Sequence, residues 1–303
     1  MSFSSTVKEE IIGCVLNKEK GKACLYGMLA FCKAFSEKQI LLQTENPMVA
    51  ERFCLLLSEV IKDETAIRQS VVTKKGYAEL YSLTIDDPYY IKIVFDYLGI
   101  DPSIKDRSID NKVVGKKKNI SFFVSGAFLV CGSVNDPLKE YHLEFVTSSK
   151  VSSEQLCRIL NENGIMAKTA ERKKSFIVYI KESENIEDML TYMGAPKSSL
   201  ELMNVKILKD VRNKINRAVN CDNANIEKTL KASEKQVESI ELIDEKMGID
   251  NLPEELRDIA ILRLENPDWN LKELAEGLNP PISRSGANHR LARIIKIAEG
   301  LKG

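Results

Sequence analysis

The stretch SGAFLVCGSVNDP, residues 125–137, decides the fold predicted for this chain. Its first part is an apolar run with Gly126 inside it and Gly132 at its end. Cys131 lies at the end of this run, where an active site would place an acid. The pattern predicts a buried helix, and Gly126 would allow a second helix to approach its backbone closely.

This helix has a counterpart 99 residues earlier in the chain. ACLYGMLAFCKAF, 23–35, aligns with FFVSGAFLVCGSV, 122–134, so that Gly27 matches Gly126 and Cys32 matches Cys131. After each helix the pattern predicts a strand, an amphipathic helix, two strands and a helix that ends before a glycine. We therefore predict an α+β fold with a duplicated unit, in which the two glycine helices pack about a pseudo-twofold axis.

Composition limits the class of protein. The chain has 303 residues, 44% hydrophobic and 29% charged, with a formal net charge of zero. No apolar run approaches the ~20 residues that a membrane-spanning helix needs. The N-terminal segment has acids within its short apolar stretch and no cleavage signal, so we expect a cytoplasmic protein. The seven cysteines include no CxxC pair, which favours reduced core thiols over a zinc site.

Charge is unevenly distributed along the C-terminal third. Residues 204–231 hold seven Lys and Arg against three acids, residues 232–258 hold nine acids against three bases, and the last 22 residues hold five bases against one acid. The two basic blocks indicate two surfaces that bind a polyanion. Runs of like charge are also typical of solvent-exposed faces that bind nothing. Two further clusters, 112–119 and 171–175, are basic as well.

One long helical segment is predicted to follow the repeats. Residues 199–220 read as a closing helix with an apolar stripe at Met203, Ile207, Val211, Ile215 and Ala218. Residues 221–250 continue as a polar helical linker, without the heptads of a coiled coil. Arg and Asn side chains on the other faces suit contacts with phosphates and base edges, and an equally good reading is a solvated exterior. The less certain DNA-binding candidates here are Arg212, Asn216 and Arg217.

Residues 251–303 have the pattern of a helix-turn-helix domain. Pro253 begins one helix, Asn270 and Glu273 form a predicted capping box for a second, and a short NPP turn leads to a third. In this last helix Ala287, Leu291, Ile294 and Ala298 share one face by helical arithmetic. Arg284 and Asn288 are the predicted base readers, since Arg pairs with guanine and Asn with adenine. The full set of DNA-binding candidates is Ser283, Arg284, Ser285, Asn288, His289, Arg290, Arg293 and Lys296.

The paired glycine helices resemble the double motif of LAGLIDADG homing endonucleases. In that family an acid at the end of each helix holds a divalent metal ion. Here the two acid positions fall on Cys32 and Cys131, and a thiol is a poor partner for Mg²⁺. Asp136 lies nearby, but one acid beyond the helix does not restore a symmetric pair. We therefore expect no catalytic residue, no metal site and no cofactor.

Three stretches together resemble the WhiA family of sporulation regulators: GAFLVCGSVNDPLKEYHLEFVT, NVKILKDVRNKINRAVNCDNANIEKT and ISRSGANHRLARI. The resemblance covers essentially the full chain. It implies a degenerate LAGLIDADG-like domain over 1–220, with repeats at about 8–100 and 119–195, a helical linker over 221–250 and a small all-α helix-turn-helix domain over 251–303.

The resemblance also implies a function. It indicates a nucleoid-associated transcription regulator of sporulation, cell division and chromosome segregation that binds double-stranded DNA without cutting it. A protein co-regulator is a second expected partner, and no membrane is. Two alternatives remain open on the residues alone: a protein-interaction scaffold and a metal-dependent DNA endonuclease.

Overall fold

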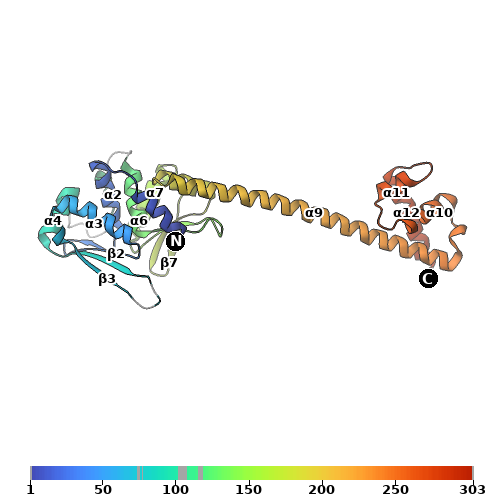
Figure 1. The fold of residues 1–303 in the computed structure, drawn as a ribbon, viewed down its shortest axis with the longest axis horizontal. Helices are drawn as coiled ribbons and strands as arrows, with labels where there is room; N and C mark the ends of the chain where they lie inside the picture. Colours follow the sequence, from blue (N-terminus) through green and yellow to red (C-terminus); the bar gives the residue numbers. More distant parts are fainter. Residues whose placement is uncertain (1, 74–75, 77, 102–107, 115–118, 302–303) are drawn as a thin grey trace. The chain divides into compact units, whose positions relative to one another are not determined.

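A computed structural model describes residues 2–73, 76, 78–101, 108–114 and 119–301 (Figure 1). They divide into two units, one up to Lys209 and one from Asp210 onwards. The boundary lies inside a single long helix, α9 (Pro196–Met247). The predicted closing helix 199–220 and most of the predicted linker 221–250 therefore belong to one continuous helix.

The N-terminal unit contains the predicted repeat. The first copy consists of α2 (Lys18–Phe31), β1 (Ala34–Ser36), β2 (Gln39–Thr44), α3 (Pro47–Ile61), η1 (Glu64–Ala66), β3 (Arg68–Val72), β4 (Leu80–Ile85) and α4 (Pro88–Leu98). The second consists of α6 (Ile120–Cys131), β5 (Gly132–Val134), β6 (Leu143–Thr147), α7 (Lys150–Glu162), β7 (Lys168–Arg172), β8 (Ser175–Ile180) and α8 (Ser183–Tyr192). Outside the copies lie α1 (Phe3–Ile12) and α5 (Asn111–Val114).

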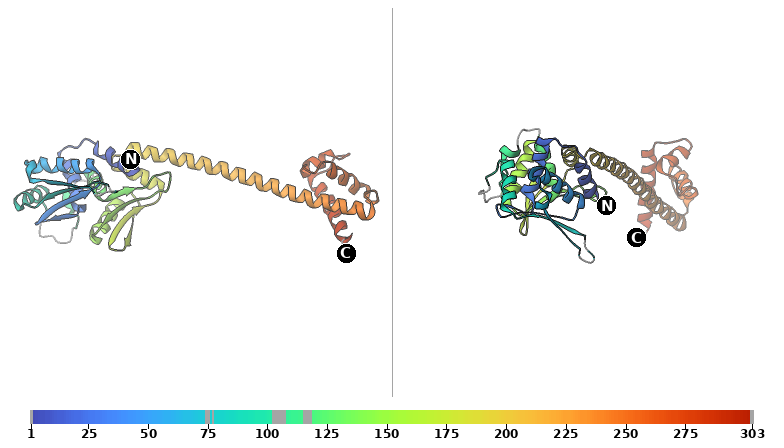
Figure 2. Two further views of the ribbon diagram at one scale, coloured as in Figure 1. Left: turned by 60° about the horizontal axis from the view of Figure 1, so that its bottom comes forward. Right: turned by 60° about the vertical axis from the view of Figure 1, so that its left-hand side comes forward.

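Each copy forms its own four-stranded antiparallel sheet, and the two orders are equivalent, β1-β2-β4-β3 and β5-β6-β8-β7. The sheets lie beside each other in Figure 2, the first in blue and the second in green. Leu42 pairs with Leu83 in the first sheet and Phe145 with Val178 in the second, and all four side chains are buried. Alternating residues thus turn one face of each sheet to the core, and the predicted α+β repeat is confirmed.

Each sheet has one strand more than the sequence predicts. The additional strands, β1 and β5, directly follow the glycine helices and pair with β2 and β6 over three residues each. A three-residue strand is too short to produce a recognisable alternation of apolar and polar residues.

The glycine helices α2 and α6 pack against each other as predicted. A Cβ atom added to Gly27 would lie 2.0 Å from the carbonyl oxygen of Phe123, and one added to Gly126 would lie 2.1 Å from that of Cys24. Only glycine permits backbones to approach this closely. Tyr26 and Phe123 extend the contact, with ring centroids 5.4 Å apart. We call this contact the glycine seam.

Local capping explains where several helices begin and end. Asn46 accepts hydrogen bonds from the N–H groups of Met48 and Val49 at the start of α3. Gly99 ends α4 in the left-handed conformation, as predicted for a glycine C-cap. Both carboxylate oxygens of Glu10 on α1 accept N–H bonds from the first turn of α9, those of Lys197 and Ser198.

The stripe predicted for 199–220 remains largely uncovered. Leu202 is buried, but Val211 and Ile215 are 49% and 57% exposed. Farther along α9, Val219, Ile226 and Leu230 are exposed as well. Helical periodicity predicts correctly which residues share a face, but it does not establish that another element covers that face.

The C-terminal unit has its own core. It is formed by η3 (Ile249–Asn251), α10 (Glu254–Glu265), α11 (Leu271–Gly277), α12 (Arg284–Leu301) and the end of α9. Ile240 and Ile243 of α9 are fully buried in this core with Leu256 and Leu291. Part of the predicted linker is therefore a structural element of the helix-turn-helix unit.

Candidate nucleic-acid interface

The glycine helices end at two thiols, a buried one at Cys32 and a partly buried one at Cys131. The Sγ atom of Cys32 donates to the carbonyl of Ala34 at 3.0 Å, and that of Cys131 to the carbonyl of Ala127 at 3.2 Å. Burial raises the pKa of the Cys131 thiol to about 12. Lys8 lies near this thiol, and burial lowers the pKa of its ammonium group. A thiol is a soft donor, so neither side chain suits Mg²⁺.

Asp136 belongs to a turn. Its carboxylate accepts the N–H of Leu138 at 2.9 Å, and its carbonyl accepts that of Lys139. Among the described residues, no three His, Cys, Asp or Glu side chains cluster so that they hold a metal ion. The donor set at the helix ends therefore lacks the paired carboxylates that a LAGLIDADG nuclease requires.

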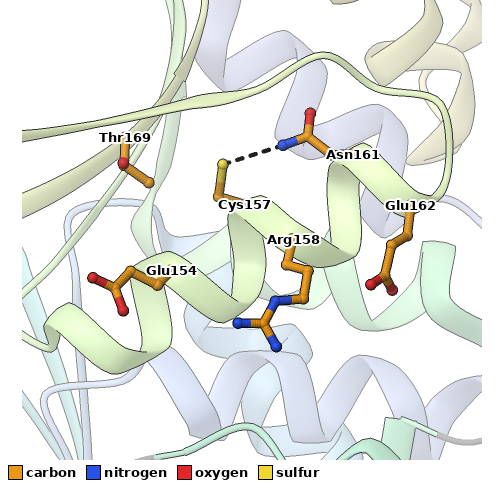
Figure 3. Close-up of a pocket in the computed structure, with 6 residues that line it drawn as sticks. All are labelled: Glu154, Cys157, Arg158, Asn161, Glu162 and Thr169. Atoms are coloured by element: carbon orange, nitrogen blue, oxygen red, sulfur yellow. Dashed lines mark hydrogen bonds between the residues drawn. The ribbon is translucent and has the colours of Figure 1, made fainter.

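A hollow of about 550 Å³ on the second copy also contains a cysteine (Figure 3). Its lining includes Cys157 and Asn161 from α7, and the amide of Asn161 donates to the sulfur at 3.4 Å. The Cys157 thiol donates to the carbonyl of Ala167, and burial raises its pKa. A thiol with a raised pKa is a weak nucleophile, so this hollow does not resemble an active site.

The helices α11 and α12 present the predicted helix-turn-helix geometry. Asn270 and Glu273 form the predicted capping box at the start of α11. The face of α12 that contains Ala287, Leu291, Ile294 and Ala298 is buried, as predicted. The opposite face leaves a polar and basic surface open to solvent: Ser285, Asn288, His289, Arg293 and Lys296 are exposed, as is Arg284 in the first turn.

Two of the predicted DNA-binding residues have structural partners. The Ser283 side chain accepts the N–H of Gly286 at 3.1 Å and so caps α12. Arg290 is half-buried and donates to the carbonyl of Glu255 at 3.3 Å. These contacts link α12 to its own turn and to α10, so the two side chains are less available than their neighbours.

The DNA-binding candidates on α9 and the second basic cluster are exposed to solvent. Arg212, Asn216 and Arg217 are all exposed. Residues 171–174 of the second cluster are exposed around the turn between β7 and β8. In the cluster 112–119, residues 115–118 lie outside the described part of the chain.

Sequence reasoning missed Arg263, which is only 2% exposed and lies in the centre of the C-terminal unit. Its Nη1 atom donates to the carbonyl of Trp269 at 2.6 Å and lies 3.4 Å from those of Asn266 and Pro267. The buried residues of α10 include Leu256, Ile259 and Arg263, at three- and four-residue steps. That spacing is the signal that places the arginine on the buried face.

Comparisons with known proteins cover the whole chain. The WhiA LAGLIDADG-like domain family matches residues 120–212, and the WhiA C-terminal HTH domain family matches residues 215–298. A "Probable cell division protein WhiA" of Clostridium perfringens (strain 13 / Type A) is 40% identical over 316 residues, covering 100% of this chain and 99% of that protein. The protein of the same name from Clostridium botulinum (strain Hall) is 38% identical with the same coverage.

A solved structure also matches over nearly the full chain. Full-length DUF199/WhiA from "Thermatoga maritima" matches with a TM-score of 0.56 and 26% identity, over 99% of this chain and 98% of that one. The homing endonuclease I-DmoI in complex with DNA and Mn matches at 14% identity over 58% of this chain and 98% of that one, with a TM-score of 0.41, too low to bear on activity. No helix among the described residues is long and apolar enough to cross a membrane.

Proposed function

This chain belongs to the WhiA family, and on that premise we propose that it is a sequence-specific transcription regulator that binds double-stranded DNA and does not cut it. The observation that carries the proposal is the two-sided character of α12, whose apolar face is buried while Arg284, Asn288 and Arg293 are exposed. A recognition helix needs this arrangement, because one face must pack on the domain while the other enters the major groove.

The side chains on the exposed face divide into two roles. Arg284 and Asn288 lie at the front of α12 and match guanine and adenine edges, each bidentate pair contributing about 1–3 kcal/mol of discrimination. Arg293 and Lys296 follow farther along the helix and suit phosphates, as do Arg212 and Arg217 on α9. Ser285 and His289 complete the surface. We propose residues 251–303, with the end of α9, as the part that reads the DNA.

The glycine seam supports a non-catalytic role for the N-terminal unit. Its packing keeps the close helix contact of the nuclease-like fold, while thiols stand at both acid positions. The expected place of action is the nucleoid. The curated relatives are named as probable cell division proteins, and we extend that role to this chain, together with the sporulation and chromosome segregation implied by the family.

The test begins with selection of binding sites from a random duplex pool, using the full chain. Fluorescence anisotropy should then show salt-sensitive binding that is tighter for the selected duplex than for a scrambled one. Arg284→Ala and Asn288→Ala should each reduce this preference about 5- to 150-fold, which corresponds to about 1–3 kcal/mol. No preference for any sequence, or nicking of the duplex in the presence of Mg²⁺ or Mn²⁺, would contradict the proposal.

The exposed apolar stripe on α9 favours protein binding as a second function. Val211, Ile215 and Ile226 are about half exposed, and apolar faces of this kind commonly mark contacts with a protein co-regulator or scaffold partner. Ile215→Asp and Ile226→Asp should then leave DNA affinity within about twofold of the parent chain. A large loss of DNA affinity in both variants would show instead that this face serves DNA binding.

A further inference from the structure

A hollow of about 420 Å³ lies inside the C-terminal unit, and of its lining residues the proposed function uses only Arg284. It is lined by one side of α9, the end of α10, the start of α11 and the start of α12. We call it the α9–α12 hollow. The lining residues that matter below are Lys228, Ser233, Gln236, Arg263, Lys272 and Arg284.

The hollow is positively charged. Lys228, Lys272 and Arg284 are exposed at its edge, and Arg263 adds a guanidinium that is buried. None of the described residues that line it is acidic. Two acids lie near these cations. Lys272 lies 3.7 Å from Glu276, but both side chains are more than 60% exposed and the pair is screened by water. The carboxylate of Asp268 acts on the Arg263 guanidinium. The electrostatics favour an anion.

Polar side chains from α9 and α10 form part of a lining whose surface is mostly apolar, and two of their atoms lack a hydrogen-bond partner among the described residues. The Nε atom of Arg263 and the Oε1 atom of Gln236 are buried without a hydrogen-bond partner among the described residues. Ser233 donates to the carbonyl of Pro267, which fixes the wall of the hollow on the α9 side. The cationic side chains at the edge of the hollow, and not its wall, therefore favour an anion as ligand.

The position of the hollow identifies the source of the anion. Arg284 is the first residue of α12, and Lys272 lies in the first turn of the helix before it. In a helix-turn-helix domain the preceding helix crosses the DNA backbone while the recognition helix enters the groove. We propose that the α9–α12 hollow binds a phosphate group of the DNA backbone, with Lys228 and Lys272 as its mobile cationic ligands. This inference rests on the proposed function.

Lys228 brings α9 into the proposed site. It belongs to α9, and the C-terminal end of that helix is already part of the unit's core through Ile240 and Ile243. A phosphate held between Lys228 on α9 and Lys272 on α11 extends the DNA contact beyond the two helices of the motif. The site adds affinity for any sequence, because a phosphate contact contains no base information.

The experiment uses the full chain with Lys228→Gln, Lys272→Gln and the matched control Lys231→Gln. Lys231 is also exposed on α9 but does not line the hollow. Binding to the selected and scrambled duplexes is measured across a series of salt concentrations. Lys228→Gln and Lys272→Gln should each weaken binding to both duplexes by similar factors and lower the slope of log affinity against log salt by about 1. Lys231→Gln should leave the slope unchanged.

The outcomes separate this inference from the proposed function. If Lys228→Gln and Lys272→Gln behave like Lys231→Gln while Arg284→Ala still loses sequence preference, the hollow is not a DNA phosphate site and the proposed function stands. If the parent chain itself has no sequence preference, the proposed function fails first. A second arm titrates inorganic phosphate at constant ionic strength. Thermal stabilisation of the parent chain but not of Lys228→Gln, with unchanged DNA slopes, would assign the hollow to a free phosphate and overturn the DNA source.

Discussion

The glycine seam and the recognition helix α12 both contain a glycine within a helix, but the two glycines are there for different reasons. A Cβ atom on Gly126 would lie 2.1 Å from a backbone oxygen of α2, which no rearrangement of side chains relieves. A Cβ atom on Gly286 would meet nothing closer than the Ser283 Oγ at 3.4 Å, an ordinary van der Waals distance. The fold requires glycine at position 126, because any side chain there would clash with the backbone of α2. At position 286 a side chain would fit, so packing within the domain does not require glycine there.

The two units differ in where their chemically important side chains lie. In the N-terminal unit the two glycine helices pack closely and end at the thiols of Cys32 and Cys131, where the resemblance predicts the acid positions of the LAGLIDADG motif. In the C-terminal unit the exposed face of α12 is polar and basic over a buried apolar face. Substitutions in the first unit should therefore change stability, and those on α12 should change DNA binding.

The largest effect is expected from Gly126→Ala and Gly27→Ala. Each adds a methyl group against a backbone carbonyl, so the two helices must separate, at a cost of about 3 kcal/mol or more. Chemical denaturation followed by far-UV circular dichroism should show an earlier transition of the N-terminal unit. Trp269, the single tryptophan of the chain, reports the C-terminal unit by fluorescence and should show no change. The matched control is Gly286→Ala, which should not destabilise the chain; equal stability of Gly126→Ala and the parent would disprove the seam.

The next effect tests the C-terminal unit in the same way. Arg263→Met keeps the apolar part of a buried side chain but removes the donors that reach the carbonyl of Trp269. Removing the buried guanidinium and its bonds to these carbonyls should destabilise this unit by about 2–4 kcal/mol. Trp269 fluorescence during denaturation provides the measurement. Arg257→Met on the same helix is the control, since Arg257 is only half-buried; the same loss in both variants would mean that the buried contacts of Arg263 are unimportant.

A smaller effect separates two arginines of α12. Arg293 is exposed, so Arg293→Ala should lower DNA affinity and reduce the salt slope by about 1 without changing stability. Arg290 donates to the carbonyl of Glu255, so Arg290→Ala should destabilise the C-terminal unit by about 1 kcal/mol and change the slope less. Salt-dependent anisotropy and Trp269 fluorescence measure the two properties. Reversed roles would place Arg290, not Arg293, on the DNA.

The smallest expected effect is a dependence of stability on pH in the N-terminal unit. A hydrogen bond from Lys206 lowers the pKa of Glu184 to about 2. Because the folded-state pKa lies below the ordinary value of about 4.3, this contact stabilises the fold above that value and is lost as pH falls towards 2. Glu184 is exposed and solvent screens the pair, so Glu184→Gln should lower the melting temperature slightly at pH 7 and not at pH 2. A shift of equal size at both pH values would exclude the charge as its cause.

Most of the fold could be predicted from local patterns. The offset of 99 residues that relates Gly27 to Gly126 and Cys32 to Cys131 indicates the duplication, and the spacing of Ala287, Leu291, Ile294 and Ala298 identifies the buried face of the last helix. Three-residue strands such as β1 are too short for periodicity to detect. The apolar face of α9 shows the opposite limit: periodicity predicts the stripe, but Val211 and Ile215 are not covered by any part of the chain that the structure describes.

The sequence by itself determined which residues share a face, where helices are capped and that a cysteine ends each glycine helix. These properties depend on backbone geometry and on residues close together in the chain. Only the tertiary structure decided which faces are buried, that Arg263 bonds the carbonyls of the following turn, and that Lys228, Lys272 and Arg284 line one hollow. Burial and charge at a site depend on the meeting of segments that are far apart in the chain, and no local period encodes that meeting.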